Sequence, residues 1–101
     1  MATFVVKTLD SIDTTNGNYL TFDNQTMILQ ILVANDSLGD NTVTVELTDS
    51  SNNVLSSLYL LSFNGGDTFS DTCKVVIPAG YKVLIRATQS STSIYLAGAE
   101  V

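Results

Sequence analysis

The stretch Thr42-Val43-Thr44-Val45-Glu46-Leu47-Thr48 alternates apolar and polar residues without interruption. Successive side chains of a β-strand point to opposite faces, so Val43, Val45 and Leu47 would share one face and the polar residues the other. A strand with one apolar and one polar face is typical of an antiparallel sheet that covers a core on one side only. The stretch therefore predicts an antiparallel β-sheet protein.

A second stretch, residues 81–88, shows nearly the same alternation. It predicts inward side chains at Tyr81, Val83, Ile85 and Ala87. Leu84 falls on the predicted outer face of this strand. Residues 26–34 are apolar almost throughout, which predicts a central strand buried on both sides.

Further segments rich in branched and aromatic residues predict the remaining strands. They span residues 3–9, 19–22, 54–63, 67–77 and 93–101. Gly- and Asn-rich breaks such as Asn16-Gly17-Asn18 and Asn64-Gly65-Gly66 separate them, and no long helical pattern occurs. Seven to eight strands at this spacing predict an all-β fold, an antiparallel β-sandwich of the jelly-roll or Ig-like kind.

The composition sets limits on size and partners. With 101 residues, of which 45% are hydrophobic, the chain predicts a single domain over residues 1–101. Ten acidic against four basic residues give a net charge of −6, which argues against nucleic acid and anionic membranes as partners. Residues 1–7 lack the pattern of a secretion signal, so we expect synthesis in a cytoplasm.

Residues capable of catalysis are scarce. The chain has no His, the usual activating base of a nucleophile, and a single Cys. Cys73 alternates with Phe69, Asp71, Val75 and Ile77, which predicts a small core residue on the inner face of its strand. We therefore expect no enzyme activity, no catalytic residue, no cofactor and no metal ligand.

Three pairs of carboxylates lie near one another in the sequence. They are Asp10 with Asp13, Asp36 with Asp40, and Asp67 with Asp71. Loops rich in oxygen ligands can hold Ca²⁺, but none of the three matches a calcium-binding loop pattern. Turns in which Asp accepts hydrogen bonds from its own loop are the simpler explanation, and the one we favour.

Aromatic residues suggest a second class of function. Four Tyr and four Phe could form a platform on which sugar rings stack, as in carbohydrate-binding β-sandwich modules. The chain has no Trp, and its aromatic residues are spread about one to a strand, which is typical of core and cross-strand packing. A free carbohydrate-binding module stays as the alternative.

The predicted surface has few charges. Only 14% of residues are charged, and Ser, Thr and Asn together make up 32 of the 101. Burying hydroxyl groups that find partners costs less than burying charges, and interface cores are depleted in charge for that reason. With few lysines to protect sheet edges, the chain is better suited to an assembled subunit than to a free binder.

The second half of the chain contains a strand ending in Ile77-Pro78-Ala79-Gly80, an alternating strand that follows it, and the closing Ala97-Gly98-Ala99-Glu100-Val101. These segments resemble small β-sandwich virion structural proteins of tailed bacteriophages. Earlier in the chain, Ile31-Leu32-Val33-Ala34-Asn35 before the Val/Thr-rich strand is similar as well. Pro78 would end its strand, and Gly80 would supply the backbone freedom that the turn needs.

The resemblance implies a non-enzymatic structural subunit of a tailed-phage virion, most simply a capsid cement or decoration protein that stabilises the head. Attachment to the neck, tail or fibre is the alternative within that class. The implied partners are the major capsid protein or other virion proteins, and the implied location is the virion.

We also expect a homo-oligomer, with a trimer favoured because it fits the three-fold points of an icosahedral shell. The contact would use charge-poor β faces or an added edge strand, and the terminal strands would contribute most.

Overall fold

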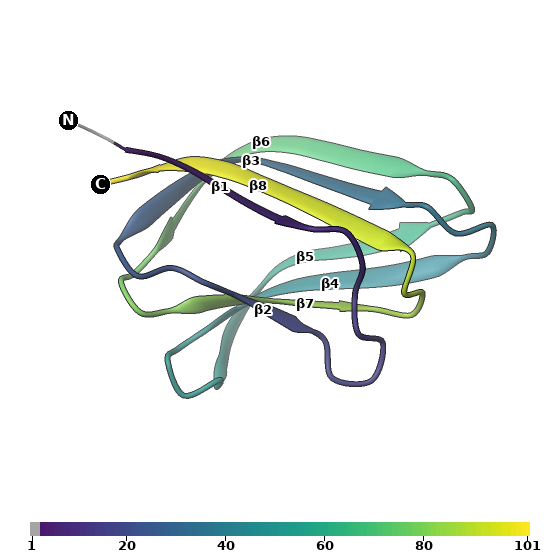
Figure 1. The fold of residues 1–101 in the computed structure, drawn as a ribbon, viewed down its shortest axis with the longest axis horizontal. Coiled ribbons are helices and arrows are strands. Elements are labelled where there is room, and N and C mark those ends of the chain that lie inside the picture. The colour runs from purple at the N-terminus through teal and green to yellow at the C-terminus, as the bar shows by residue number, and fades with distance from the viewer. Residues whose placement is uncertain (1–2) are drawn as a thin grey trace.

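The computed structural model describes residues 3–101, and these form eight β-strands in two antiparallel sheets (Figure 1). The strands are β1 Phe4–Leu9, β2 Asn18–Thr21, β3 Thr26–Asn35, β4 Asn41–Thr48, β5 Val54–Phe63, β6 Thr68–Ile77, β7 Lys82–Ala87 and β8 Thr92–Glu100. Residues 3–101 contain no helix long and apolar enough to cross a membrane.

The order of strands identifies the kind of sandwich. One sheet runs β1-β8-β3-β6 and the other β2-β7-β4-β5, and every pair is antiparallel. The two sheets lie face to face, and the start of β1 and the end of β8 lie at the same end of the sandwich (Figure 1). This eight-stranded double-sheet order is the jelly roll. The all-β sandwich prediction is confirmed, and the jelly roll replaces the Ig-like option.

The hydrophobic core lies between the two sheets. The inward positions predicted from alternation are confirmed at the centres of β4 and β7, where Val45 is 1% and Ile85 0% exposed. From the other sheet, Ile31 and Val33 of β3 and Leu96 of β8 complete the same core. Burial of these side chains between the sheets is the main stabilising contribution.

The turn after β6 has the conformation expected from its sequence. β6 ends at Ile77, directly before Pro78. Gly80 has a φ of 83°, and the amide of Tyr81 donates to the carbonyl of Pro78 at 3.0 Å. A β-turn with positive φ at its third residue is a type II turn, which favours Gly there.

A buried polar cluster closes one end of the sandwich. The side-chain oxygen of Asn41 accepts hydrogen bonds from the amides of Thr88 and Gln89, and its amide group donates to Thr92 Oγ1 at 2.7 Å. Asn35 donates to the carbonyls of Gly39 and Asn64, both at 2.9 Å. The two Asn side chains are also joined to each other at 3.3 Å. They therefore tie three loops and both sheets together.

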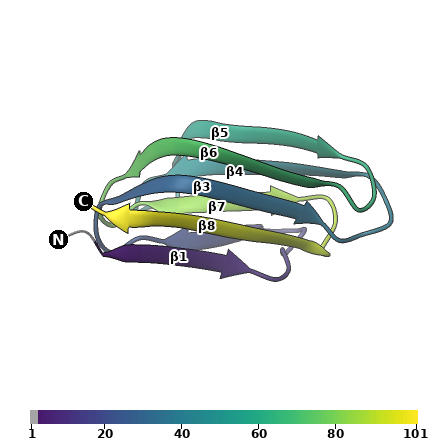
Figure 2. The ribbon, with the colours of Figure 1, turned by 90° about the horizontal axis from the view of Figure 1, so that it is seen from above.

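The prediction that residues 26–34 are buried on both sides is wrong. β3 is central in its sheet, between β8 and β6, but only one of its faces lies against the core. Leu29 and Leu32 are 39% and 38% exposed. Within residues 3–101, no helix or loop covers the outside of this sheet as seen from above (Figure 2). The apolar residues on that side therefore remain at the surface.

Leu84 lies on the outer face of β7, as predicted, but it is 4% exposed. Its neighbours across the sheet are Tyr19 on β2 and Glu46 on β4. The loop at Gly17 also packs closely, since a Cβ added there would meet a Leu84 methyl group at 3.0 Å. Alternation gave the correct side of the strand but could not show that neighbouring groups cover the side chain.

We predict that Leu96→Ala lowers the free energy of unfolding by about 2–5 kcal/mol, because it opens a cavity in a packed core. The matched control is Leu60→Ala, since Leu60 is 70% exposed where Leu96 is 2% exposed. We expect the control to change stability by less than about 0.5 kcal/mol. Denaturant unfolding measures both, and equal losses would contradict the assignment of inner and outer faces.

We predict that Asn41→Ala destabilises the protein by about 2–4 kcal/mol, because it leaves several buried donors and acceptors without partners. Asn53→Ala is the control, since Asn53 is exposed and its side chain donates to Asp49 in a surface turn. Thermal and denaturant unfolding should show little change for the control. If the two variants lost similar stability, the Asn41 cluster would not hold the sheets together.

Candidate interaction surface

The outer side of the sheet β1-β8-β3-β6 is rich in apolar side chains, and we call it the apolar face. Its residues form rows that run across all four strands. One row consists of Phe4, Ala99, Met27 and Val76. The neighbouring rows are Val6, Ala97, Gln30 and Thr72, and Thr8, Tyr95, Leu32 and Ser70. The wholly apolar row lies at the end of the sandwich where the chain termini are (Figure 1).

Much of the exposed apolar side-chain surface of the described residues gathers on this face. Phe4 is 88% exposed and Val6 is 54% exposed. Leu29, Leu32, Val76 and Tyr95 add to the same surface. Isolated exposed apolar residues are normal, but a contiguous patch is typical of an interaction site.

The apolar face also lacks negative charge. The four strands that form it contain two acidic residues, Asp71 and Glu100, and both occupy inward positions of their strands. Asp71 accepts a hydrogen bond from the hydroxyl of Tyr59 in the other sheet at 2.8 Å. Lys74 of β6 is the one charged residue at an outward position of these strands. A surface of this kind loses little hydration energy when it is covered.

The outer side of the other sheet, which we call the charged face, is different. Arg86 of β7 forms an ion pair with Glu46 of β4, and its Nε donates to Glu46 Oε1 at 3.0 Å. Lys82 lies over the ring of Tyr19, 5.4 Å from its centroid, and donates to Asn52. Charged pairs are expensive to remove from water. The apolar face is therefore the stronger candidate for contact.

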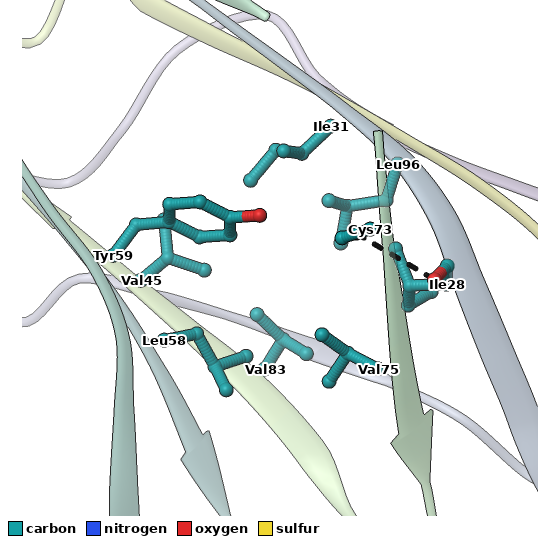
Figure 3. Close-up of a pocket in the computed structure, with 9 residues that line it drawn as sticks. All are labelled: Ile28, Ile31, Val45, Leu58, Tyr59, Cys73, Val75, Val83 and Leu96. Carbon is teal, nitrogen blue, oxygen red and sulfur yellow. Dashed lines mark hydrogen bonds between the residues drawn. The ribbon is translucent and has the colours of Figure 1, made fainter. Parts of the chain in front are cut away.

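The core near β5 and β6 is closely packed. A cavity of about 10 Å³ lies there between the sheets, which is space for roughly one water molecule. Figure 3 shows its lining, which is apolar apart from Tyr59 and Cys73. This cavity is too small for a ligand larger than water.

A polar hollow opens between the two sheets, where β1 lies near the segment that follows β2. It has a volume of about 200 Å³ and is lined by Lys7, Asp23, Asn24, Glu100 and neighbouring side chains. The ammonium group of Lys7 lies over the ring of Phe22, 5.6 Å from its centroid. The hollow is smaller than the usual 300–1,000 Å³ of small-molecule sites.

Two carboxylates of the predicted pairs, Asp13 and Asp67, accept hydrogen bonds from their own loops. Asp13 accepts hydrogen bonds from the amides of Thr15 and Asn16, and these bonds lower its pKa. Asp67 accepts from the amide of Asn64 within its own loop, whereas Asp71 lies on β6. Within residues 3–101, no three Cys, Asp or Glu side chains lie close enough to hold a metal ion.

The tyrosines are not arranged as a sugar platform. Tyr19 lies on the charged face, Tyr95 on the apolar face, and Tyr59 points into the sandwich toward Asp71. Tyr81 packs against the core. Stacking of successive sugar rings needs aromatic faces on one surface, and the four side chains are dispersed over three.

Cys73 lies on the inner face of β6, as predicted, but it is half-buried rather than fully enclosed. Its thiol donates to the carbonyl of Ile28 at 3.6 Å. Tyr59 is close by, and burial together with the hydrogen bond to Asp71 raises the pKa of its hydroxyl above the ordinary value. The residues that line the cavity beside the Cys73 thiol include no cation, which is the setting of a structural cysteine.

Comparison with known proteins places the fold but not a family. No family model matches the chain, and no curated protein matches its sequence. The chain is similar in structure to the Drosophila NLP core, with a TM-score of 0.53 and 20% identity over 95% of each chain. It is also similar to the coat protein of Tobacco streak virus, with a TM-score of 0.51 and 9% identity over 99% of this chain and 85% of that one.

A third similar structure is a Clostridium thermocellum xylanase with CBM22-1 and GH10 modules, complexed with xylohexaose. The TM-score is 0.52 and the identity 10%, over 97% of this chain. This chain spans only 24% of the xylanase chain. At these identities the likenesses show a shared β-sandwich fold alone.

Sequence reasoning identified the charge-poor surface but not which face carries it. The outward residues of β3 were assigned to a buried environment, although their register with β8 places them beside Tyr95 and Ala97. The first and last strands do carry a sequence signal for this face, because their outward positions are also apolar. These positions, which alternate with the core residues, are Phe4, Val6, Ala97 and Ala99.

We predict that part of the acid sensitivity of the fold comes from Asp49, whose pKa is lowered from 3.8 by hydrogen bonds from Asn53 and Ser51. A carboxylate with a lowered folded pKa stabilises the fold above its unfolded pKa, and that contribution is lost as pH falls through the folded value. As the pH is lowered from about 5 to about 2, the melting temperature should therefore fall less steeply for Asp49→Asn than for the parent.

Asp40→Asn is the control for that experiment, since the Asp40 carboxylate accepts no side-chain hydrogen bond from the described residues. Its pH profile should run parallel to that of the parent. Chelator should leave the melting temperature of all three proteins unchanged. A drop caused by chelator would reveal a metal site in the loops.

Proposed function

We propose that this chain is a non-enzymatic structural subunit of a tailed-phage virion, acting as a capsid cement or decoration protein. The observation that carries the proposal is the apolar face, a broad carboxylate-free surface on a chain whose net charge is −6. A structural subunit works by burying area against its neighbours in an assembly, and such a face supplies that area without breaking ion pairs.

Other features support a structural role. The jelly roll occurs widely in viral shells, and the coat protein of Tobacco streak virus has the same fold. The phage-like turn at Ile77-Pro78-Ala79-Gly80 has the geometry that its sequence requires. The closing Ala97-Gly98-Ala99 segment has a physical reason too, because a Cβ at Gly98 would collide with the carbonyl of Met27 on β3.

In this role the chain would bind the major capsid protein or another virion protein and would form a homo-oligomer, with a trimer favoured by the symmetry of a shell. The Drosophila NLP core, of similar fold, is described in terms of pentamer formation. A carbohydrate-binding role is the weaker candidate, because the tyrosines that would stack on sugar rings lie on different surfaces.

The experiment is to quantify this protein in purified phage particles by mass spectrometry. A copy number on the order of hundreds per particle would support a capsid protein, whereas a copy number of about six to twelve would indicate a position in the neck or tail. Absence of the protein from the particle would overturn the proposal. A screen of the isolated protein against glycans should give no saturable binding.

A further inference from the structure

The edges of both sheets carry features that oppose the addition of another strand. The edge strands are β1 and β6 in one sheet, and β2 and β5 in the other. β1 turns the charged Lys7 inward over Phe22, and β6 turns Asp71 inward to Tyr59. Inward charges on an edge strand oppose pairing with a second chain, because pairing would bury them further.

The other two edges are protected differently. β2 has only four residues, which is too short to template a stable pairing. β5 is long, but its register with β4 is interrupted twice, between Val45 and Glu46 and between Leu47 and Thr48. Irregularities of this kind twist an edge away from a partner. These features protect the edges with few lysines. We therefore expect contact between molecules to use the faces of the sheets and not their edges.

The size of the apolar face suits a specific contact. Three strands about 30 Å long and the shorter β1, about 20 Å long, lie about 4.8 Å apart and cover roughly 550 Å². Stable interfaces bury about 1,200–2,000 Å² in total, or about 600–1,000 Å² from each partner. The flat area of the face is close to the lower end of that range, and the projecting side chains of Phe4 and Tyr95 add to it.

Charge decides which partner fits. Each molecule carries a net charge of −6, so two copies repel unless they meet where carboxylates are absent. Asp13 and Asp49 lie in exposed loops, and Glu46 of the charged face is held in an ion pair by Arg86. The apolar face holds no outward carboxylate and one outward cation, Lys74, so copies can meet there without opposing their negative charges or breaking an ion pair.

We infer that the apolar face is the contact between copies of this chain, which meet through this face and do not extend each other's sheets. This inference deepens the proposed structural role and rests on it, because a subunit in a shell needs such a contact. The charged face and the loops then remain outside the contact.

The test compares two Val→Glu variants in the full chain by sedimentation velocity. Val6 on the apolar face and Val54 at the start of β5 are 54% and 47% exposed, and both lie in edge strands. We expect Val6→Glu to weaken self-association on the order of 100-fold, because it places unpaired carboxylates inside the contact. Val54→Glu should associate as the parent does.

A second matched pair guards against misfolding of one variant. Leu32→Glu lies on the apolar face and Leu60→Glu on the outside of the other sheet. Circular dichroism should show all four variants folded, and only the two apolar-face variants should dissociate. Raising salt from about 50 mM to about 500 mM should strengthen association of the parent, because screening reduces the repulsion between its negative charges.

Three results would overturn the inference. They are a parent that is monomeric up to about 1 mM, equal weakening by Val6→Glu and Val54→Glu, or association that weakens with salt. A monomeric parent that is still abundant in particles would leave the proposed function standing, with another virion protein on the apolar face. A self-associating parent absent from particles would refute the proposed function alone.

Discussion

The buried pair Asn35 and Asn41 is the interaction on which the rest of the structure depends. Each is almost fully buried, and each uses both ends of its amide group to bind loops that connect one sheet to the other. Because polar groups in a core are costly unless every one is bonded, the cluster permits a single alignment of the two sheets. At the other side of the sandwich, the bond from Tyr59 to Asp71 again joins the sheets.

A fixed sandwich determines where the remaining apolar side chains go. The core between the sheets is filled, with space left for about one water molecule. β3 and β8 have apolar residues on both sides. The apolar side chains that do not point into the core therefore lie on the outside of their sheet (Figure 2). That surface is preformed, since it belongs to paired strands rather than loops. A rigid surface loses little entropy on association, which suits a permanent structural contact.

Much of the fold follows from the sequence because period-two alternation is local. Val43 and Ile85 fall on the core side for that reason, and all eight strands lie within a few residues of their predicted bounds. The apolar face was not predictable, because Leu32 is as apolar as Val33 and only the pairing with β8 shows which of them faces out. The role of Asn41 depends on contacts with Thr88 and Thr92, nearly fifty residues away, and no local pattern reveals them.

The most direct test of this account is a density map of the protein in its assembled form, obtained by electron cryomicroscopy at side-chain resolution. The account predicts that Leu32 and Tyr95 are covered by another copy of the chain, while Arg86 and Glu46 stay outside that contact. A map in which copies meet through the charged face, or through paired edge strands with the apolar face exposed to solvent, would contradict it.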